Sequence, residues 1–143
     1  MLRSQILKDQ SKTEKLGEEI ALELQGKTPL IYLTGDLGAG KTTLTRGLIR
    51  ALTRKDTRVL SPSYSYLNHY QASSAIYHFD LYRLDDPEQI HQLGLLSFLE
   101  QTDALRIVEW PERAQGLIST PDIHIHLEIA SNFRWAHLNY LPG

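Results

Sequence analysis

Apolar and polar residues along this chain alternate with two different periods, one typical of helices and one typical of strands. In residues 11–24 and 41–54 the apolar side chains recur at helical spacing, which predicts two amphipathic helices. Residues 29–34, "PLIYLT", form a short apolar run rich in strand-forming residues, as expected of a buried strand. A strand, a short loop and a helix are therefore expected to follow one another around residue 40.

Further strands are predicted in the second half of the chain. The alternation is clearest in residues 122–130, and residues 133–141 are expected to pair antiparallel with them. A helical pattern interrupts the strands at the start of residues 85–100, and Gly94 is expected to end it. The predicted strands after residue 60 are 61–70, 74–84, 104–110, 122–130 and 133–141. This order of elements predicts a three-layer α/β domain with a mixed, largely parallel sheet.

Capping residues predict where the helices begin and end. Ser11 and Glu14 fit a capping box at the start of the first helix, and Gly26 lies where that helix would stop. In the helical pattern after residue 84, Asp86 is the expected cap and Pro87 the first helical residue.

The composition favours one globular domain spanning residues 1–143, since 41% of the residues are hydrophobic and 22% are charged. The formal net charge of −2 argues against a surface that coats nucleic acid generally. The absence of cysteine excludes disulfides, thiolate metal sites and cysteine nucleophiles. No apolar run approaches the roughly 20 residues of a membrane span, and no secretory signal is visible. We therefore expect a cytoplasmic protein without a membrane association.

A glycine-rich loop, "GDLGAGKTT", separates the predicted strand 29–34 from the helix that follows it. Gly35, Gly40, Lys41 and Thr42 satisfy the phosphate-loop pattern G-x-x-x-x-G-K-[ST]. Glycines let backbone N–H groups approach phosphate oxygens, the lysine adds a positive charge, and the hydroxyl can bind Mg²⁺. The expected nucleotide-binding residues of the loop are Gly35, Asp36, Leu37, Gly38, Ala39, Gly40, Lys41, Thr42 and Thr43.

The alternative is a chance glycine-rich turn, but its place between a predicted strand and a predicted helix favours a P-loop NTPase-like fold that binds a nucleoside triphosphate with Mg²⁺. The pattern alone leaves ATP and GTP open, although an N-K-x-D-like stretch typical of guanine readers is absent.

Two acidic residues end apolar strands and are candidates for holding the metal ion or orienting water. Asp80 ends "IYHFD" and Glu109 ends "LRIVE". Open α/β sheets bind their ligands at the carboxyl ends of their strands, where both acids are expected to lie. Solvated acids at strand ends are the alternative, and the pattern does not say which of the two binds the metal.

Two groups of charged or histidine residues outside the loop could be binding sites or ordinary solvated surfaces. Arg46, Arg50 and Arg54 share a helical face that either contacts a nucleic acid or an acidic partner surface, or is merely solvated. His124 and His126 share a strand face, but no third ligand accompanies them, so we expect a polar outer face and no metal site.

Four segments in order, "GDLGAGKTT", "SPSYSYLNHY", "YHFDLYRL" and "VEWPER", resemble the TsaE (YjeE) family of small bacterial ATPases. The resemblance covers the chain from Thr13 to about Arg134. It implies an ATP-binding and ATP-hydrolysing accessory protein in the synthesis of threonylcarbamoyladenosine, the modified base beside the anticodon of tRNA. It also implies that the partner is a TsaB–TsaD heterodimer, with TsaD as the transferase.

The resemblance assigns roles to individual residues. The metal ligands fall on Thr42 and Glu109, and Lys41 and Asp80 complete the catalytic set with Glu109. Trp110 follows the acid as it does in the family, although an ordinary core tryptophan is an equal alternative.

The other residues that the resemblance assigns are expected to bind the nucleotide rather than to catalyse its hydrolysis. Ser61 and Ser63 match a segment that resembles a switch loop facing the γ-phosphate. Thr13 and Arg134 match positions near the adenine or the ribose. One departure is His69, which stands where relatives often have an acid, and we assign it no catalytic role.

The sequence is compatible with three functions. The first is a partner-dependent ATPase that acts as a switch in tRNA modification. The second is a small-molecule phosphotransferase, for which the chain lacks an obvious arginine-rich lid. The third is a nucleotide-binding adaptor that hardly hydrolyses ATP, and the presence of both Asp80 and Glu109 argues against it.

Overall fold

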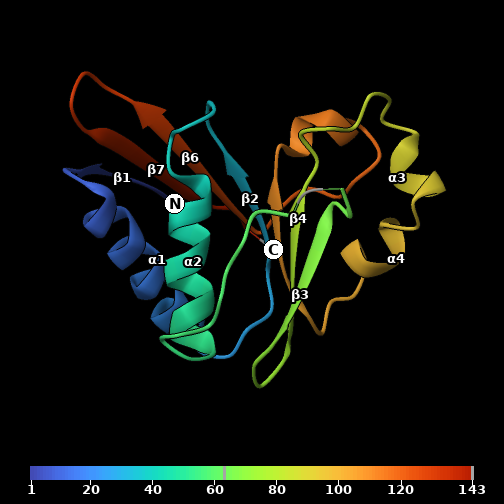
Figure 1. The fold of residues 1–143 in the computed structure, drawn as a ribbon, viewed down its shortest axis with the longest axis horizontal. Helices are drawn as coiled ribbons and strands as arrows, with labels where there is room; N and C mark the ends of the chain where they lie inside the picture. Colours follow the sequence, from blue (N-terminus) through green and yellow to red (C-terminus); the bar gives the residue numbers. More distant parts are fainter. Residues whose placement is uncertain (63, 143) are drawn as a thin grey trace.

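The computed structural model describes residues 1–62 and 64–142, and these residues form one seven-stranded sheet with helices on both faces (Figure 1). The strands are β1 (Leu2–Leu7), β2 (Leu30–Thr34), β3 (Leu67–Gln71), β4 (Ala75–Asp80), β5 (Leu105–Glu109), β6 (Ile123–Ile129) and β7 (Arg134–Tyr140). The helices are α1 (Gln10–Leu24), α2 (Lys41–Leu52), α3 (Gln89–Gln92), α4 (Leu96–Leu99) and the 3₁₀ helix η1 (Pro111–Ala114).

The strand order across the sheet is β1-β7-β6-β2-β5-β4-β3. The four neighbouring strands β6, β2, β5 and β4 are parallel, whereas β1, β7 and β3 join the sheet through antiparallel pairs. Because parallel strands end at the same edge, the residues that follow β2, β4 and β5 lie together there. The predicted antiparallel pairing of the last two strands is confirmed.

Each face of the sheet has its own apolar core, which confirms the three-layer α/β architecture. On one face α1 and α2 pack with Leu16, Ile20 and Leu48 against the sheet. On the other face, α3, α4 and their connecting loops pack over β4 and β5, where Phe79 and Val108 are fully buried. Figure 1 shows the long helices and the short helices on opposite sides of the strands.

Helices α1 and α2 approach each other closely because glycines lie at their contact. A Cβ atom on Gly47 would lie 2.0 Å from the carbonyl oxygen of Glu14. A Cβ atom on Gly17 would lie 2.2 Å from the carbonyl oxygen of Leu44. No side chain other than hydrogen fits at either position, so the two helices are joined backbone to backbone.

Several predicted boundaries were wrong. Asp9, and not Ser11, caps α1, because its carboxylate accepts a hydrogen bond from the Lys12 backbone N–H at 2.9 Å. The helix predicted at the start of residues 85–100 begins at Gln89 and not at Pro87. Its predicted end at Gly94, where φ is +70°, is confirmed, and a second short helix, α4, follows. The strand predicted from residue 61 begins only at Leu67.

Strand β1 was not predicted at all, and it adds an edge to the sheet by pairing with β7. Among the described residues, none of the helices has the length and apolar character needed to cross a membrane.

Candidate functional site

The glycine-rich loop connects β2 to the first turn of α2. Its last residue, Gly40, is the N-cap of α2 and has a φ of +106°, a backbone conformation that residues with side chains rarely adopt. No side chain caps this helix end. The first N–H groups of α2 are therefore available to an anion, and the positive end of the helix dipole reinforces them.

The ammonium group of Lys41 is held inside the loop. Its Nζ donates to the carbonyl oxygens of Gly35 at 2.5 Å and of Asp36 at 3.0 Å. The same atom lies 4.5 Å from the centroid of the Trp110 ring, within the range of a cation–π contact. Burial lowers the pKa of Lys41, although Glu109 and Asp80 nearby oppose that shift.

Trp110 reaches Lys41 through an unusual backbone turn. The residue directly follows Glu109 at the end of β5 and has a φ of +58°, which is uncommon for a bulky side chain. Its ring also lies against Tyr82, with the two centroids 4.8 Å apart. Trp110 is half-buried: its ring contacts the Lys41 ammonium and also packs against the apolar core on the α3–α4 face of the sheet.

The two candidate acids, Asp80 and Glu109, are register partners on the neighbouring parallel strands β4 and β5. Glu109 is 2% exposed, and its Oε2 lies 2.5 Å from Nε2 of His78. Asp80 is less buried, and its Oδ1 accepts a hydrogen bond from the Tyr82 backbone N–H at 3.0 Å. Burial raises the pKa of Asp80, and this backbone hydrogen bond partly offsets the rise.

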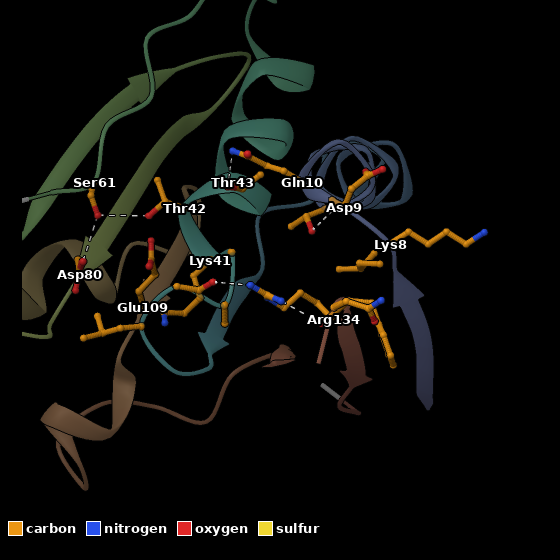
Figure 2. A pocket seen from close by; sticks show the side chains of 18 of the residues that line it. Lys8, Asp9, Gln10, Lys41, Thr42, Thr43, Ser61, Asp80, Glu109 and Arg134 are labelled. Atoms are coloured by element: carbon orange, nitrogen blue, oxygen red, sulfur yellow. Dashed lines mark hydrogen bonds between the residues drawn. The ribbon is translucent and has the colours of Figure 1, made fainter. Parts of the chain in front are cut away.

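A serine hydroxyl links the loop helix to one of the acids. Oγ of Ser61 lies 3.4 Å from Oγ1 of Thr42 and donates to Oδ2 of Asp80 at 3.4 Å (Figure 2). The segment from Ser61 to Tyr66 thereby touches both α2 and β4, and the Asp80 N–H donates to the Tyr66 carbonyl oxygen at 3.0 Å. Ser63, the other predicted residue of this segment, lies outside the described residues.

These residues surround one cavity of about 570 Å³, within the usual size range of small-molecule sites. Figure 2 shows Lys41, Thr42 and Glu109 on one side and the β1–α1 junction on the other. The predicted site residues that line the cavity are Thr13, Leu37, Gly38, Ala39, Gly40, Lys41, Thr42, Thr43, Ser61, Asp80, Glu109, Trp110 and Arg134. The predicted residues Gly35 and Asp36 do not line the cavity, and their carbonyl oxygens accept hydrogen bonds from Lys41.

The far end of the cavity is formed by segments distant in the sequence. Thr13 is 3% exposed on α1, and Arg134 begins β7. Nη2 of Arg134 donates to the Gly38 carbonyl oxygen at 3.4 Å, so this side chain reaches across to the loop. Six further lining residues were not predicted: Leu7, Lys8, Asp9, Gln10, Asn132 and Phe133.

The oxygen atoms that line the cavity are suitable ligands for Mg²⁺ bound with a nucleoside triphosphate. The Thr42 hydroxyl and the carboxylates of Glu109 and Asp80 offer the oxygen ligands that Mg²⁺ prefers. In the part of the chain that the structure describes, no group of three or more histidine, cysteine or acidic residues could hold a metal ion by itself.

Two other groups have local partners. Arg50 pairs with Glu14 at 3.6 Å and donates to the Thr57 carbonyl oxygen at 2.9 Å, and Arg54 pairs with Asp56 at 3.3 Å. The histidines of β6 share one hydroxyl: Oγ1 of Thr34 lies 2.9 Å from Nε2 of His124 and 2.7 Å from Nδ1 of His126.

A family model described as "Threonylcarbamoyl adenosine biosynthesis protein TsaE" matches residues 7–135, which include the whole cavity lining. The chain belongs to the TsaE family. This TsaE-family chain is 42% identical to the tRNA threonylcarbamoyladenosine biosynthesis protein TsaE of Haemophilus influenzae over 118 residues, which cover 81% of the chain and 73% of the relative.

A more distant relative is the protein of the same name from Aquifex aeolicus, with 36% identity over 131 residues that cover 90% of the chain and 89% of the relative. Among solved structures, Bacillus subtilis YdiB superposes with a TM-score of 0.77, at 21% identity, over 99% of this chain and 87% of that one. This last likeness shows that the two proteins share their fold.

Proposed function

We propose that this TsaE-family chain binds ATP with Mg²⁺ and hydrolyses it to support threonylcarbamoyladenosine modification of tRNA. The observation that carries the proposal is the meeting of Lys41, Thr42, Asp80 and Glu109 in one wall of a cavity. The same cavity is lined by Thr13 and Arg134, beside which we place the nucleoside. The loop geometry, the two acids and the family membership support the same reading.

Each residue has a distinct role in this proposal. The first N–H groups of α2 and the Lys41 ammonium bind phosphate oxygens. Thr42 and Glu109 hold the metal ion, which, when bound, would offset charge that develops on the phosphates. Asp80 accepts a hydrogen bond from the attacking water and orients it, since its carboxylate is held by Ser61 and by the Tyr82 N–H.

The segment Ser61–Tyr66 is the proposed sensor of the γ-phosphate. Ser61 is within hydrogen-bonding distance of both Thr42 and Asp80, so loss of the phosphate between them would change its contacts. His69 is no part of this mechanism, because it is exposed and its ring lies against Tyr77, 5.1 Å between centroids, outside the cavity lining.

The proposed partner is the TsaB–TsaD heterodimer. Direct tRNA contact through Arg46, Arg50 and Arg54 is the second part of this proposal, and Arg46 is the most suitable test position because the other two have local acidic partners. An Arg46→Glu variant should bind tRNA more weakly at low salt, where phosphate contacts are strongest. Equal affinity of this variant and the wild type would leave a solvated face as the correct interpretation.

The deciding experiment is ATP hydrolysis by the purified chain, alone and with TsaB–TsaD added. Stimulation by the heterodimer that is lost in Glu109→Ala supports a partner-dependent ATPase. ATP binding without hydrolysis in either condition would favour the adaptor. Absence of both stimulation and complex formation would favour the phosphotransferase, which a panel of small acceptors would then identify.

A further inference from the structure

His78 is a fully buried histidine beneath the candidate metal site. It lies in β4, two residues before Asp80, and none of its surface is exposed. Strand alternation places Ile76, His78 and Asp80 on one face, and Ile76 belongs to the core packed under α2. A polar ring at this depth needs an explanation, because burying a polar group without a partner is costly.

The polar contact that the structure gives this ring is with Glu109. Nε2 of His78 lies 2.5 Å from Oε2 of Glu109, and both side chains are almost completely removed from solvent. The other ring nitrogen, Nδ1, is buried and has no hydrogen-bond partner among the described residues. Since a carboxylate oxygen can only accept, Nε2 is the nitrogen that donates. The ring is therefore fixed by packing and by this one carboxylate.

The register of the strands explains how the contact forms. His78 is paired with Ile107, and Glu109 lies two residues further along β5 on the same face. The imidazole therefore contacts the carboxylate diagonally, from a position two residues further from the carboxyl ends of the two strands. Glu109 also neighbours Asp80 in register, so a second carboxylate lies beside it without any hydrogen bond between the two.

We infer that His78 is a positioning residue, which binds one oxygen of Glu109 and thereby fixes the carboxylate in the orientation that holds the Mg²⁺ ion. A glutamate has three rotatable side-chain bonds, and without this contact the repulsion from Asp80 would turn it away from Thr42. The histidine touches no reactant itself. This role rests on the proposed function, because it requires that Glu109 hold the metal ion.

Positioning residues behind metal ligands typically change metal affinity or activity by about 10- to 100-fold when they are replaced. The variant His78→Leu removes the donor and retains an apolar side chain in the core. The variant His78→Gln retains an N–H donor close to the place of Nε2. A matched control is Ile76→Val, in the same strand and on the same buried face, with no contact to Glu109.

The measurement is the affinity for ATP by calorimetry, once with Mg²⁺ and once with EDTA, so that the ratio of the two dissociation constants reports the metal contribution. Thermal unfolding of each variant shows whether it is folded. We expect His78→Leu to lose about 10- to 100-fold of the enhancement by Mg²⁺ while its affinity in EDTA is unchanged. His78→Gln should recover most of the enhancement, and Ile76→Val should keep all of it.

Two results overturn the inference. If a folded His78→Leu protein retains the full enhancement, His78 is a core residue only. The same conclusion follows if Ile76→Val loses as much as His78→Leu, because the effect would then come from lower stability. Should the leucine variant fail to fold, His78→Asn, which is too short to reach Glu109, is judged by the same ratio.

Failure of the proposed function gives a different pattern. A wild-type chain that binds no ATP in either condition overturns the ATPase proposal, and the role of His78 with it. A wild type that shows the enhancement, together with a Glu109→Gln variant that lacks it, establishes the metal role of Glu109 independently of His78.

Discussion

Asp80 and Glu109 face each other at the carboxyl ends of two adjacent parallel strands, yet different neighbours hold them. Glu109 is buried against His78, whereas Asp80 is bound by the Ser61 hydroxyl and by the Tyr82 N–H. Two acids in register with different surroundings suit two different tasks. Asp80 has the more open position, from which it can contact a water molecule in the cavity.

Replacement of Asp80 by asparagine should therefore slow ATP hydrolysis by about 100-fold or more, the lower end of the usual contribution of an acid–base group. ATP should still bind within a few-fold of the wild-type affinity, since the loop and Lys41 are unchanged. Steady-state hydrolysis and calorimetry measure the two quantities. Asp85→Asn, at an exposed position outside the cavity, is the control. Wild-type turnover in the Asp80 variant would remove this residue from the mechanism.

Nucleotide binding should change the fluorescence of Trp110. Its ring is in contact with the Lys41 ammonium, which would exchange its loop carbonyl partners for phosphate oxygens. Trp135 lies outside the cavity lining and serves as an internal comparison. Titration with ATP should alter the emission of the Trp135→Phe variant and leave that of Trp110→Phe unaffected. The reverse result would place the nucleotide elsewhere.

Replacement of Arg134 should show whether its side chain contacts the nucleoside or the phosphates of ATP. Hydrogen bonds that involve a charged group contribute about 1.5–3 kcal/mol, so Arg134→Ala should weaken ATP binding by about tenfold or more. Inorganic tripolyphosphate should bind equally well to the variant and the wild type if the side chain contacts adenine or ribose. An equal loss for both ligands would instead assign Arg134 to the phosphates. Arg58→Ala is a control at an exposed position outside the cavity lining.

Stability should fall at alkaline pH through Tyr140. Burial, together with the hydrogen bond from its hydroxyl to Glu23 at 2.6 Å, raises the pKa of Tyr140 from 10.0 to about 12. The folded state thus favours the protonated tyrosine. The stabilisation that comes from the raised pKa of Tyr140 is fully present below pH 10. It is lost from the free energy of unfolding as the pH rises toward 12.

The Tyr140→Phe variant tests this pH dependence. It should be less stable than the wild type by about 1.5 kcal/mol at pH 7, the lower end of the range for a hydrogen bond to a charged group, because the Glu23 carboxylate is partly exposed. The difference should narrow between pH 10 and 12 in urea unfolding experiments. Tyr32, whose pKa burial also raises to about 12, is present in both proteins and cancels in the comparison. A difference that is constant with pH would contradict the prediction.

The place of the glycine-rich loop between a strand and a helix, and the meeting of the two acids at one edge of the sheet, could be predicted from the sequence because each depends on local order. A glycine-rich loop after an apolar strand has few alternative structures, and parallel strands bring Asp80 and Glu109 to one edge. Strand β1 was missed because an edge strand is only half buried and its alternation is weak, with Leu2 and Ile6 exposed. The cap of α1 was misplaced because the carboxylate of Asp9, two residues before Ser11, accepts the hydrogen bond from the Lys12 N–H.

The contact between His78 and Glu109 was beyond the reach of the sequence. Alternation placed His78 on the face of Asp80, but it could not tell that the two strands would be neighbours in this register. The far wall of the cavity was missed for a similar reason. Its residues, such as Gln10 and Asn132, come from opposite ends of the chain, and only the pairing of β1 with β7 brings those ends together.

The backbone contact between α1 and α2 determines which parts of the site can move. Thr13 and Thr42 lie on these two helices, whose backbones are in direct contact at Gly17 and Gly47. Ser61 lines the cavity outside the two helices, and its hydroxyl is within hydrogen-bonding distance of Thr42 and Asp80. If the cavity binds ATP as proposed, the side formed by α1 and α2 should stay rigid, and we expect the conformational response to phosphate cleavage to begin at Ser61.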